Sequence, residues 1–129
     1  MNYLICIGSN TEPASHLALA RRELQRRFSD VWFSPEMVTA PIGMRHNQAS
    51  FINQLARLSS DAQPKEIEQQ LKEIEQLAGR TPEEKALEVV RLDLDLLMAD
   101  EEVLRPKDLQ RDFVKQLLKP IEGHLTMSL

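Results

Sequence analysis

Hydrophobic residues form an unbroken run over residues 3–7, and the run stops at Gly8-Ser9-Asn10. A short apolar run bounded by turn residues is typical of a buried strand, so we expect a strand over residues 2–7. After the turn, apolar residues return every three or four positions while arginines occupy the opposite face. This spacing predicts an amphipathic helix whose buried side is formed by Leu17, Ala20, Leu24 and Phe28.

Two extended segments follow, separated by a loop. Residues 31–39 combine β-branched and aromatic types, and Pro35 indicates an edge position or a bulge within them. Residues 40–50 are rich in turn-forming types, which predicts an irregular loop. Residues 51–56 then predict a third strand.

A second helix has clear start and stop residues. Pro64 suits its first turn, and Gly79 suits the position just after its end. Its expected apolar stripe consists of Ile67, Leu71, Ile74 and Leu77. Further along the chain, the spacing of Leu109, Phe113 and Leu117 predicts one more helix before Pro120.

Between these two helices lies a polar, Glu-rich stretch over residues 80–88, followed by alternating residues over 89–98. The alternation predicts a fourth strand with a leucine face and a charged face. The leucine face is Leu92, Leu94 and Leu96, and the charged face is Arg91, Asp93 and Asp95.

The predicted order, β-α-β-β-α-β-α, indicates an α/β (α+β) protein. Its first six elements match a ferredoxin-like split βαβ layout, with an antiparallel or mixed sheet and helices packed on it. A length of 129 residues suits a single domain over residues 1–129. The formal net charge of −4 disfavours a nucleic-acid or membrane-surface partner. The apolar run that holds the only cysteine, Cys6, is too short to span a membrane, so we expect a cytoplasmic protein. We also expect it to be a monomer or a weak homo-oligomer.

Asp93 and Asp95 carry the clearest chemistry in the sequence. Alternation along a strand places both carboxylates on one side, about 6 to 7 Å apart. Oxygen ligands of this kind suit Mg²⁺, which shares its remaining positions with waters and phosphates. The alternative is an amphipathic strand whose acidic residues face solvent, with Arg91 neutralising Asp93 without any metal.

Other polar residues allow a functional and an ordinary interpretation. Asn53 and Phe51 lie two residues apart and therefore share a strand face, where an amide and a ring could bind a flat heterocycle. The alternative is an edge amide that faces water. Glu75 and Arg80, near the end of the second helix, are equally compatible with surface charges.

Six ordered stretches together resemble the 6-hydroxymethyl-7,8-dihydropterin pyrophosphokinase family. They are residues 5–10, 39–43, 51–53, 74–75 with 79–80, 92–97 and 111–114. The Asp pair preceded by Gly79-Arg80 is the most specific of these elements, and the resemblance covers residues 3–121.

The resemblance implies an enzyme of folate biosynthesis that transfers the pyrophosphoryl group of ATP to the hydroxymethyl oxygen of a reduced pterin. Two Mg²⁺ ions are implied, with ATP as co-substrate. The implied catalytic residues are Arg80, Arg91, Asp93 and Asp95, of which the two aspartates would also be the metal ligands. The implied pterin-binding residues are Thr39, Pro41, Gly43, Phe51, Asn53 and Phe113. The implied nucleotide-binding residues are Glu75, Leu96, Arg105 and Arg111.

The sequence departs from the family pattern in the loop before the Asp pair. A second arginine, a tryptophan and a final arginine of the family are replaced by Pro82, Leu87 and Val90. The same loop carries Glu83, Glu84 and Glu88 against only Lys85, a charge balance that should repel a triphosphate. Beyond the pair, Arg105 replaces a family histidine and could still contact phosphate.

Three functional hypotheses are compatible with these residues. The first is a divergent pterin pyrophosphokinase. The second is a catalytically impaired pterin- or metal-binding homologue that acts as a regulatory or interaction domain. The third is a ferredoxin-like structural domain in which Arg91 pairs with Asp93.

Overall fold

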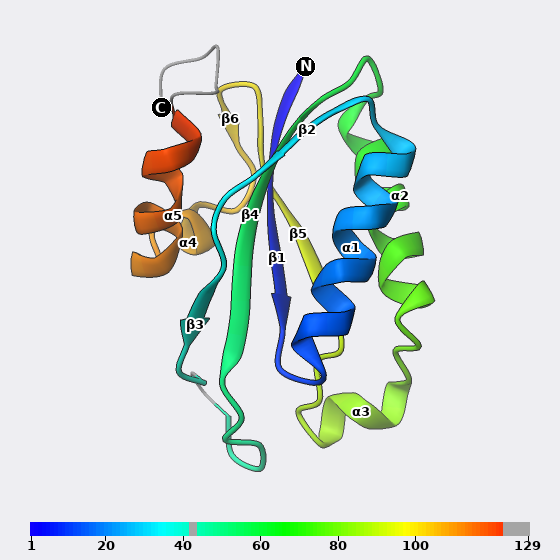
Figure 1. Ribbon diagram of the computed structural model, residues 1–129, viewed down its shortest axis with the longest axis vertical. Coiled ribbons are helices and arrows are strands. Elements are labelled where there is room, and N and C mark those ends of the chain that lie inside the picture. Colours follow the sequence, from blue (N-terminus) through cyan, green and yellow to red (C-terminus); the bar gives the residue numbers. More distant parts are fainter. Residues whose placement is uncertain (42–43, 123–129) are drawn as a thin grey trace.

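A single antiparallel sheet lies between helices on both of its faces (Figure 1). The structure, a computed structural model, describes residues 1–41 and 44–122. The strands are β1 (Asn2–Ser9), β2 (Asp30–Phe33), β3 (Met37–Thr39), β4 (Phe51–Ser59), β5 (Asp93–Ala99) and β6 (Glu102–Val103). The helices are α1 (Pro13–Arg27), α2 (Pro64–Leu77), α3 (Pro82–Ala86), α4 (Pro106–Leu109) and α5 (Asp112–Glu122).

The strand order is β2-β4-β1-β5-β6, and β3 also pairs with β4. Every pairing is antiparallel. The predicted α+β class and its ferredoxin-like layout are therefore confirmed. β1 and β5 are neighbouring central strands. Because they pair antiparallel, the turn after β1 and the start of β5 lie at the same end of the sheet.

The segment predicted as one extended stretch over residues 31–39 forms two short strands. Ser34 marks the break: its N–H donates to the Leu55 carbonyl at 2.9 Å, and its hydroxyl accepts the Leu55 N–H at 2.9 Å. Pro35 follows, and a proline cannot donate to the strand ladder. The Ser34 hydroxyl thus accepts the Leu55 N–H in place of the Ser34 carbonyl, which instead accepts the side-chain amide of Gln54 at 2.7 Å.

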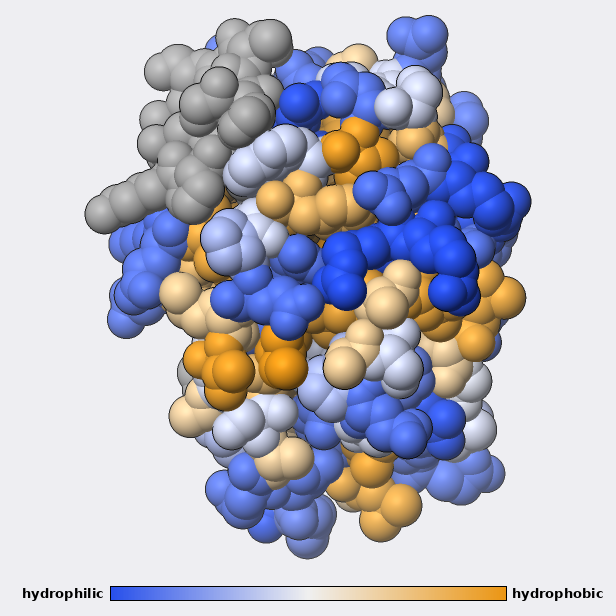
Figure 2. Space-filling view, in the orientation of Figure 1, coloured by the Kyte–Doolittle hydropathy of each residue, from blue (hydrophilic) through white to orange (hydrophobic). Residues whose placement is uncertain are grey.

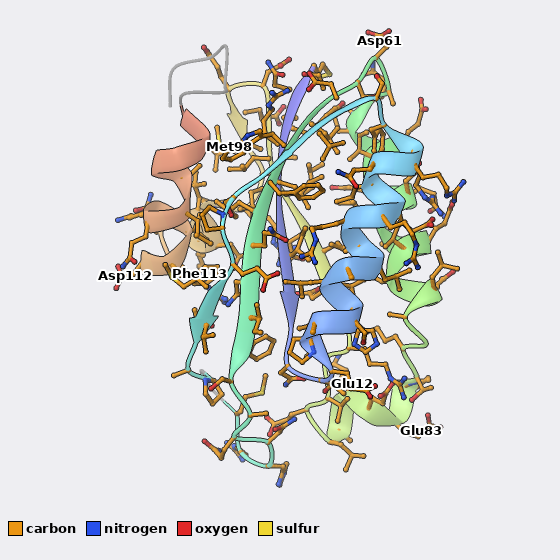
Figure 3. The ribbon with its side chains drawn as sticks, viewed as in Figure 1. Glu12, Asp61, Glu83, Met98, Asp112 and Phe113 are labelled. Atoms are coloured by element: carbon orange, nitrogen blue, oxygen red, sulfur yellow. The ribbon has the colours of Figure 1, made fainter. Side chains whose placement is uncertain are left out.

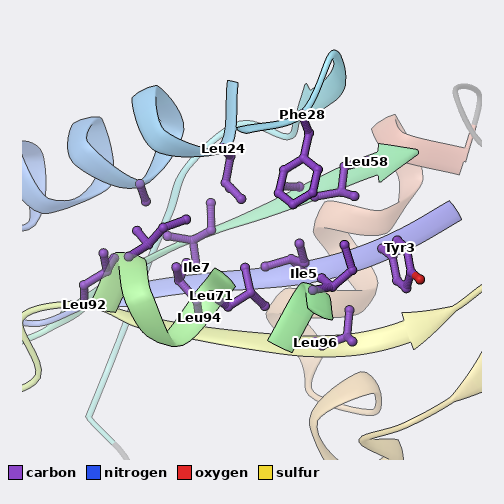
Figure 4. Packing of buried hydrophobic residues seen from close by; sticks show 14 of the residues in the cluster. Tyr3, Ile5, Ile7, Leu24, Phe28, Leu58, Leu71, Leu92, Leu94 and Leu96 are labelled. Atoms are coloured by element: carbon purple, nitrogen blue, oxygen red, sulfur yellow. The ribbon is translucent and has the colours of Figure 1, made fainter. Parts of the chain in front are cut away.

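The main core lies between the sheet and the helices α1 and α2 (Figure 4). Alternate residues of β1 (Tyr3, Ile5 and Ile7) face these helices and are fully buried. The stripe of α2 contains Ile67, Leu71 and Ile74 as predicted, but its next member is buried Ala78. Leu77 was placed in the stripe wrongly: it is 57% exposed, because the 3.6-residue period continues at position 78.

A smaller core lies on the opposite face, where α5 packs on the sheet through Val114 and Leu117. It covers Leu4 and Leu55 and the β5 residues Leu97 and Met98, which both face α5 because the β1–β5 register shifts there. Helix α5 covers only part of this face. The part of the sheet nearest the turn after β1 is left for the site described below.

The fourth predicted strand begins later than the pattern indicates. β5 starts at Asp93, because Val90 pairs with Asn10 instead of with a strand: its N–H donates to Asn10 Oδ1 at 2.7 Å, and its carbonyl accepts the Asn10 N–H at 2.9 Å. Residues 89–92 therefore run outside the sheet.

The surface is largely polar. On the face shown in Figure 2, hydrophilic residues predominate and apolar groups form separate islands. Within residues 1–41 and 44–122, no helix combines the length and the apolar character needed to cross a membrane.

Candidate active site

Two hollows meet at the N-terminal end of β5. The first, called here the aromatic cavity, has a volume of about 250 Å³ and lies between the sheet and the start of α5. The second, the edge groove, has a volume of about 370 Å³ and lies between β5, α2 and the residues before α4. Asp93 and Asp95 line both hollows, so the predicted pair stands at their junction.

Strand alternation puts both aspartates on the α5 side of β5, as predicted. They are partners of Gly8 and Cys6 in β1, while β6 pairs only with the far end of β5. Burial raises the pKa of Asp93, and the Glu75 carboxylate adds to that rise. Burial and the negative charge of Asp93 raise the pKa of Asp95 to about 7. The surroundings therefore disfavour two negative charges on the pair at neutral pH.

The charges of the edge groove come from α2 and from the segment after β5. Glu75 Oε2 accepts the Leu94 N–H at 2.7 Å, at the edge of β5 that β6 leaves unpaired, and its other oxygen lies 3.5 Å from Arg80 Nη1. Arg105 lies 3.5 Å from Asp95 and 2.6 Å from Asp108. Leu96 also lines this groove. Glu75, Leu96 and Arg105 are thus brought together as one group, and Arg80 is joined to it through Glu75.

The polar wall of the aromatic cavity is built by the β1–β4 and β3–β4 pairings. Asn53 is almost fully buried, and its Nδ2 donates to the Thr39 hydroxyl at 2.7 Å. Gly8 is its partner in β1, and a Cβ at Gly8 would lie only 3.0 Å from Asn53 Oδ1. Glycine at this position therefore leaves the space that the Asn53 amide occupies.

The apolar walls come from two rings on different elements. Phe51 stands at the start of β4, and Phe113 lies in the first turn of α5 (Figure 3). Both are half-buried and line the aromatic cavity. Arg111 lines this cavity as well, rather than the edge groove, and its guanidinium lies 3.4 Å from Asp108.

The remaining pterin-side predictions concern the loop after β3. Ala40 and Met44 line the aromatic cavity, whereas Pro41 between them is half-buried and is not among the lining residues. Gly43 lies outside the described residues.

Arg91 does not share a face with the Asp pair, which corrects the prediction from alternation. Its Nε donates to Glu84 at 2.7 Å. Its guanidinium lies beside Gly79, just beyond the end of α2, because a Cβ added at Gly79 would be 3.5 Å from Arg91 Nη1. The cause is the late start of β5, since residue 91 precedes the strand. The Arg91–Asp93 pair that the third hypothesis expected is therefore wrong.

Two of the negative charges in the acidic loop are compensated by contacts within the fold. Glu84 is neutralised by Arg91 and accepts the Thr81 N–H at 2.9 Å, and these bonds hold its pKa below the usual range. Glu88 accepts backbone N–H groups from residues 45–47, which lowers its pKa as well. Glu83 points away from the protein (Figure 3). The expected repulsion of a triphosphate is thus reduced at two of three glutamates.

Sequence reasoning missed three residues of this region. Asp108 lines the aromatic cavity and binds both Arg105 and Arg111, three residues away on either side, a spacing that could have indicated it. Glu88 and Asn10 act through contacts to distant segments. No local pattern could have revealed those two.

A metal at the Asp pair would need ligands in addition to those that the described residues supply. In the described parts of the chain, no group of three or more His, Cys, Asp or Glu side chains is arranged to hold an ion. Two half-buried carboxylates with raised pKa values nevertheless fit Mg²⁺, which commonly takes one or two carboxylates and completes its shell with waters and substrate phosphates. The donor set matches a metal that arrives with its nucleotide.

Taken together, these features define a ferredoxin-like α+β protein with a two-part candidate site, in which an acidic pair separates a ring-lined cavity from a charged groove. The sequence model of the 7,8-dihydro-6-hydroxymethylpterin-pyrophosphokinase (HPPK) family matches residues 4–123, and the chain belongs to this family. Members of the family are ATP-dependent pterin pyrophosphokinases of folate biosynthesis that use Mg²⁺. Among curated proteins, none matches the sequence significantly.

Proposed function

We propose that this protein is an active pyrophosphokinase that transfers the pyrophosphoryl group of ATP to the hydroxymethyl oxygen of a reduced pterin. One observation carries the proposal: Asp93 and Asp95 line both hollows, so a metal held there would touch the contents of each. Transfer between two bound substrates needs such a junction, because positioning and charge neutralisation supply most of the catalysis of phosphoryl transfer.

The aromatic cavity is proposed to bind the pterin ring. Its volume of about 250 Å³ is below the roughly 300–1,000 Å³ typical of sites for drug-sized ligands, which suits one flat ring system. Phe51 and Phe113 supply faces for stacking. The bond to Thr39 fixes the amide plane of Asn53, so that Asn53 can recognise the polar edge of the ring.

The edge groove is proposed to bind the triphosphate. Arg105 lines the groove and contacts Asp95, whereas Arg80 contacts Glu75 and is not among the lining residues. A guanidinium has five donors, so each arginine keeps donors for phosphate oxygens. Glu75 and Leu96 would line the nucleotide site. Arg111, which lines the aromatic cavity near Asp108, would approach the nucleotide from that side.

The chemistry proposed here needs no protein nucleophile. The substrate hydroxyl forms a bond to the β-phosphorus as the bond from that phosphorus to the α–β bridging oxygen breaks. AMP leaves with the electron pair, and the hydroxyl proton passes to solvent water. Mg²⁺, held by Asp93 and Asp95, would supply positive charge to the phosphate oxygens. The arginines of the site hold and orient the same oxygens.

A specific observation favours the second candidate, a pterin-binding homologue without efficient transfer. The edge groove is lined by four carboxylates (Glu68, Glu75, Asp93 and Asp95) but by only two cations (Lys72 and Arg105) among the described residues. Leu87, at the family's tryptophan position, is 61% exposed and belongs to neither hollow. The aromatic cavity is therefore better suited to binding a pterin than the edge groove is to binding a triphosphate.

Turnover and binding assays separate the two candidates. We expect purified protein with ATP, Mg²⁺ and 6-hydroxymethyl-7,8-dihydropterin to release AMP, and we expect Asp95→Asn to abolish that release. Glu83→Gln is the matched control, because it removes one carboxylate from the neighbouring surface and should leave the rate unchanged. Pterin binding by calorimetry without any AMP release would instead support the second candidate. We further propose that residues 1–129 form one domain and that the protein is a monomer or a weak homo-oligomer, which sedimentation can test.

A further inference from the structure

Glu88 is bound by the loop that precedes β4. Its carboxylate accepts the backbone N–H groups of three successive residues: Arg45 at 2.8 and 3.1 Å to its two oxygens, His46, and Asn47 at 3.2 Å. Successive N–H groups that converge in this way form a concave anion site. Here the anion is a side chain of the same protein, more than 40 residues away in sequence.

The backbone of Glu88 is also held in an uncommon conformation. Its φ of 58° lies in the left-handed region, which is unfavourable for a residue with a side chain. Its carbonyl accepts the side-chain amides of Asn10 at 2.9 Å and of Asn47 at 3.0 Å. Contacts from two other segments therefore maintain a conformation that the residue would not prefer alone.

These contacts join three segments at the mouth of the aromatic cavity. Asn10 belongs to the turn after β1 and brackets Val90 with two further hydrogen bonds. Met44 directly precedes the bonded Arg45, and Val90 lies two residues after Glu88. Both Met44 and Val90 line the cavity. In Figure 1 the loop before β4 and α3 lie at the same end of the sheet. Glu88 is thus the point at which both cavity-lining segments are tied together.

We propose that Glu88 is a positioning residue that holds Met44 and Val90 against the aromatic cavity and so sets its affinity for the pterin ring. This inference rests on the proposed function for the identity of the ring. Glu88 itself does not touch the cavity, and it acts through the loop that it binds. The nucleotide side has no part in this contact, so the effect of Glu88 should fall on pterin binding alone.

Two substitutions at this position test the proposal from different directions. Glu88→Gln keeps the shape but replaces one acceptor oxygen by an amide nitrogen that opposes the three N–H donors. Glu88→Gly removes the side chain and relieves the left-handed backbone, so a general loss of folding is not expected. Glu83→Gln is the matched control, with the same charge change on the same surface segment.

The first readout is amide hydrogen exchange without any ligand. We expect exchange at residues 45–47 to become at least tenfold faster in both Glu88 variants and to stay unchanged in the control. The second readout is steady-state kinetics, or pterin titration if turnover is slow. We expect the KM or Kd for pterin to rise about tenfold, while kcat and the KM for Mg-ATP change less than twofold.

The outcomes are separable. Unchanged exchange at residues 45–47 would show that Glu88 does not hold the loop. Faster exchange with unchanged pterin affinity would show that the loop does not position the ring, and either result overturns the proposal. If the unsubstituted protein binds no pterin at all, the proposed function fails and the role in ring binding fails with it. The exchange data would then still decide whether Glu88 holds the loop.

Discussion

The carboxylate of Asp95 lies 3.5 Å from the guanidinium of Arg105, so the acidic pair already has a cation from its own chain. Arg105 is held there by Asp108 at 2.6 Å. The arrangement gives Arg105 two opposing effects: it competes with a metal for Asp95, and it supplies positive charge to the edge groove.

Removal of Arg105 should therefore change metal and nucleotide binding in opposite directions. In Arg105→Gln, we expect tighter Mg²⁺ binding in the absence of ATP, because Asp95 loses its cation, and a rise of about tenfold in the KM for ATP, because a phosphate contact is lost. Calorimetry with Mg²⁺ and initial-rate kinetics measure the two effects. Lys107→Gln, an exposed neighbour that lines neither hollow, is the control. Weaker binding of both ligands would contradict this account of Arg105.

The raised pKa of Asp95, about 7, predicts how stability depends on pH without metal. An unfolded aspartate has a pKa of about 3.9, so between the two values the folded state binds more protons than the unfolded state. Stability from this group is therefore complete below about pH 4 and falls as pH rises towards 7. We expect the contribution of Asp95 to the melting temperature, measured as wild type minus Asp95→Asn, to fall over this range, and Mg²⁺ to raise the melting temperature most near pH 7.

Asp95→Asn should remove much of this pH dependence, because the amide does not titrate. Asp93 contributes a slope of the same sign, since its pKa is also raised. Thermal melts from pH 4.5 to 7.5, with and without Mg²⁺, provide the measurement. If the melting temperature of the metal-free wild type, taken relative to Asp95→Asn, does not fall across this range, the raised pKa of Asp95 is refuted.

Two glycines should respond differently to alanine. At Gly8 the new Cβ would lie 3.0 Å from Asn53 Oδ1, so the amide must shift, and we expect pterin affinity to fall about tenfold, or about 1.4 kcal/mol. At Gly79 the Cβ would meet only ordinary contacts, but its φ of 86° is unfavourable for alanine, so stability should fall by about 1–2 kcal/mol. Pterin titration should detect the loss of affinity in Gly8→Ala, and thermal melts should detect the loss of stability in Gly79→Ala. A loss of pterin affinity in Gly79→Ala would contradict this account.

The hydroxyl of Thr39 gives a test of how Asn53 is oriented. Thr39→Val keeps the shape but loses the acceptor for Asn53 Nδ2, and a buried donor left without a partner costs about 1–3 kcal/mol unless the amide turns. We expect a several-fold rise in the KM for pterin at unchanged KM for ATP. Thr39→Ser keeps the hydroxyl and should restore the wild-type value. If serine fails as valine does, the methyl group rather than the hydrogen bond is what matters at this position.

The residues that the sequence predicted well are those whose neighbours follow from local periodicity. Asp93 and Asp95 share a face because alternation is a property of any strand. Ile67, Leu71 and Ile74 face the sheet because the helical period places them together, and the same period assigns position 78, not Leu77, to the stripe.

What could not be predicted depends on contacts between distant segments. Asn10 takes the hydrogen bonds of Val90 that a strand would have used, so β5 begins late and Arg91 turns to Glu84. Glu88 looks like a repulsive charge in the sequence, yet backbone N–H groups from another loop bind and stabilise that charge. A charge count cannot include backbone donors whose position only the folded chain determines.

The separation of the main core from the aromatic cavity bears on how readily this protein can change. Among the described residues, no side chain of the core beneath α1 and α2 lines that cavity. The apolar burial of the main core is therefore untouched by substitutions in the cavity wall, whereas Val114 of the smaller core does line the cavity. The cavity can diverge by single substitutions without loss of the fold. A library restricted to Ala40, Met44 and Val90 should accordingly yield mostly folded proteins with altered ring preference, which makes this wall a starting point for selecting new specificities.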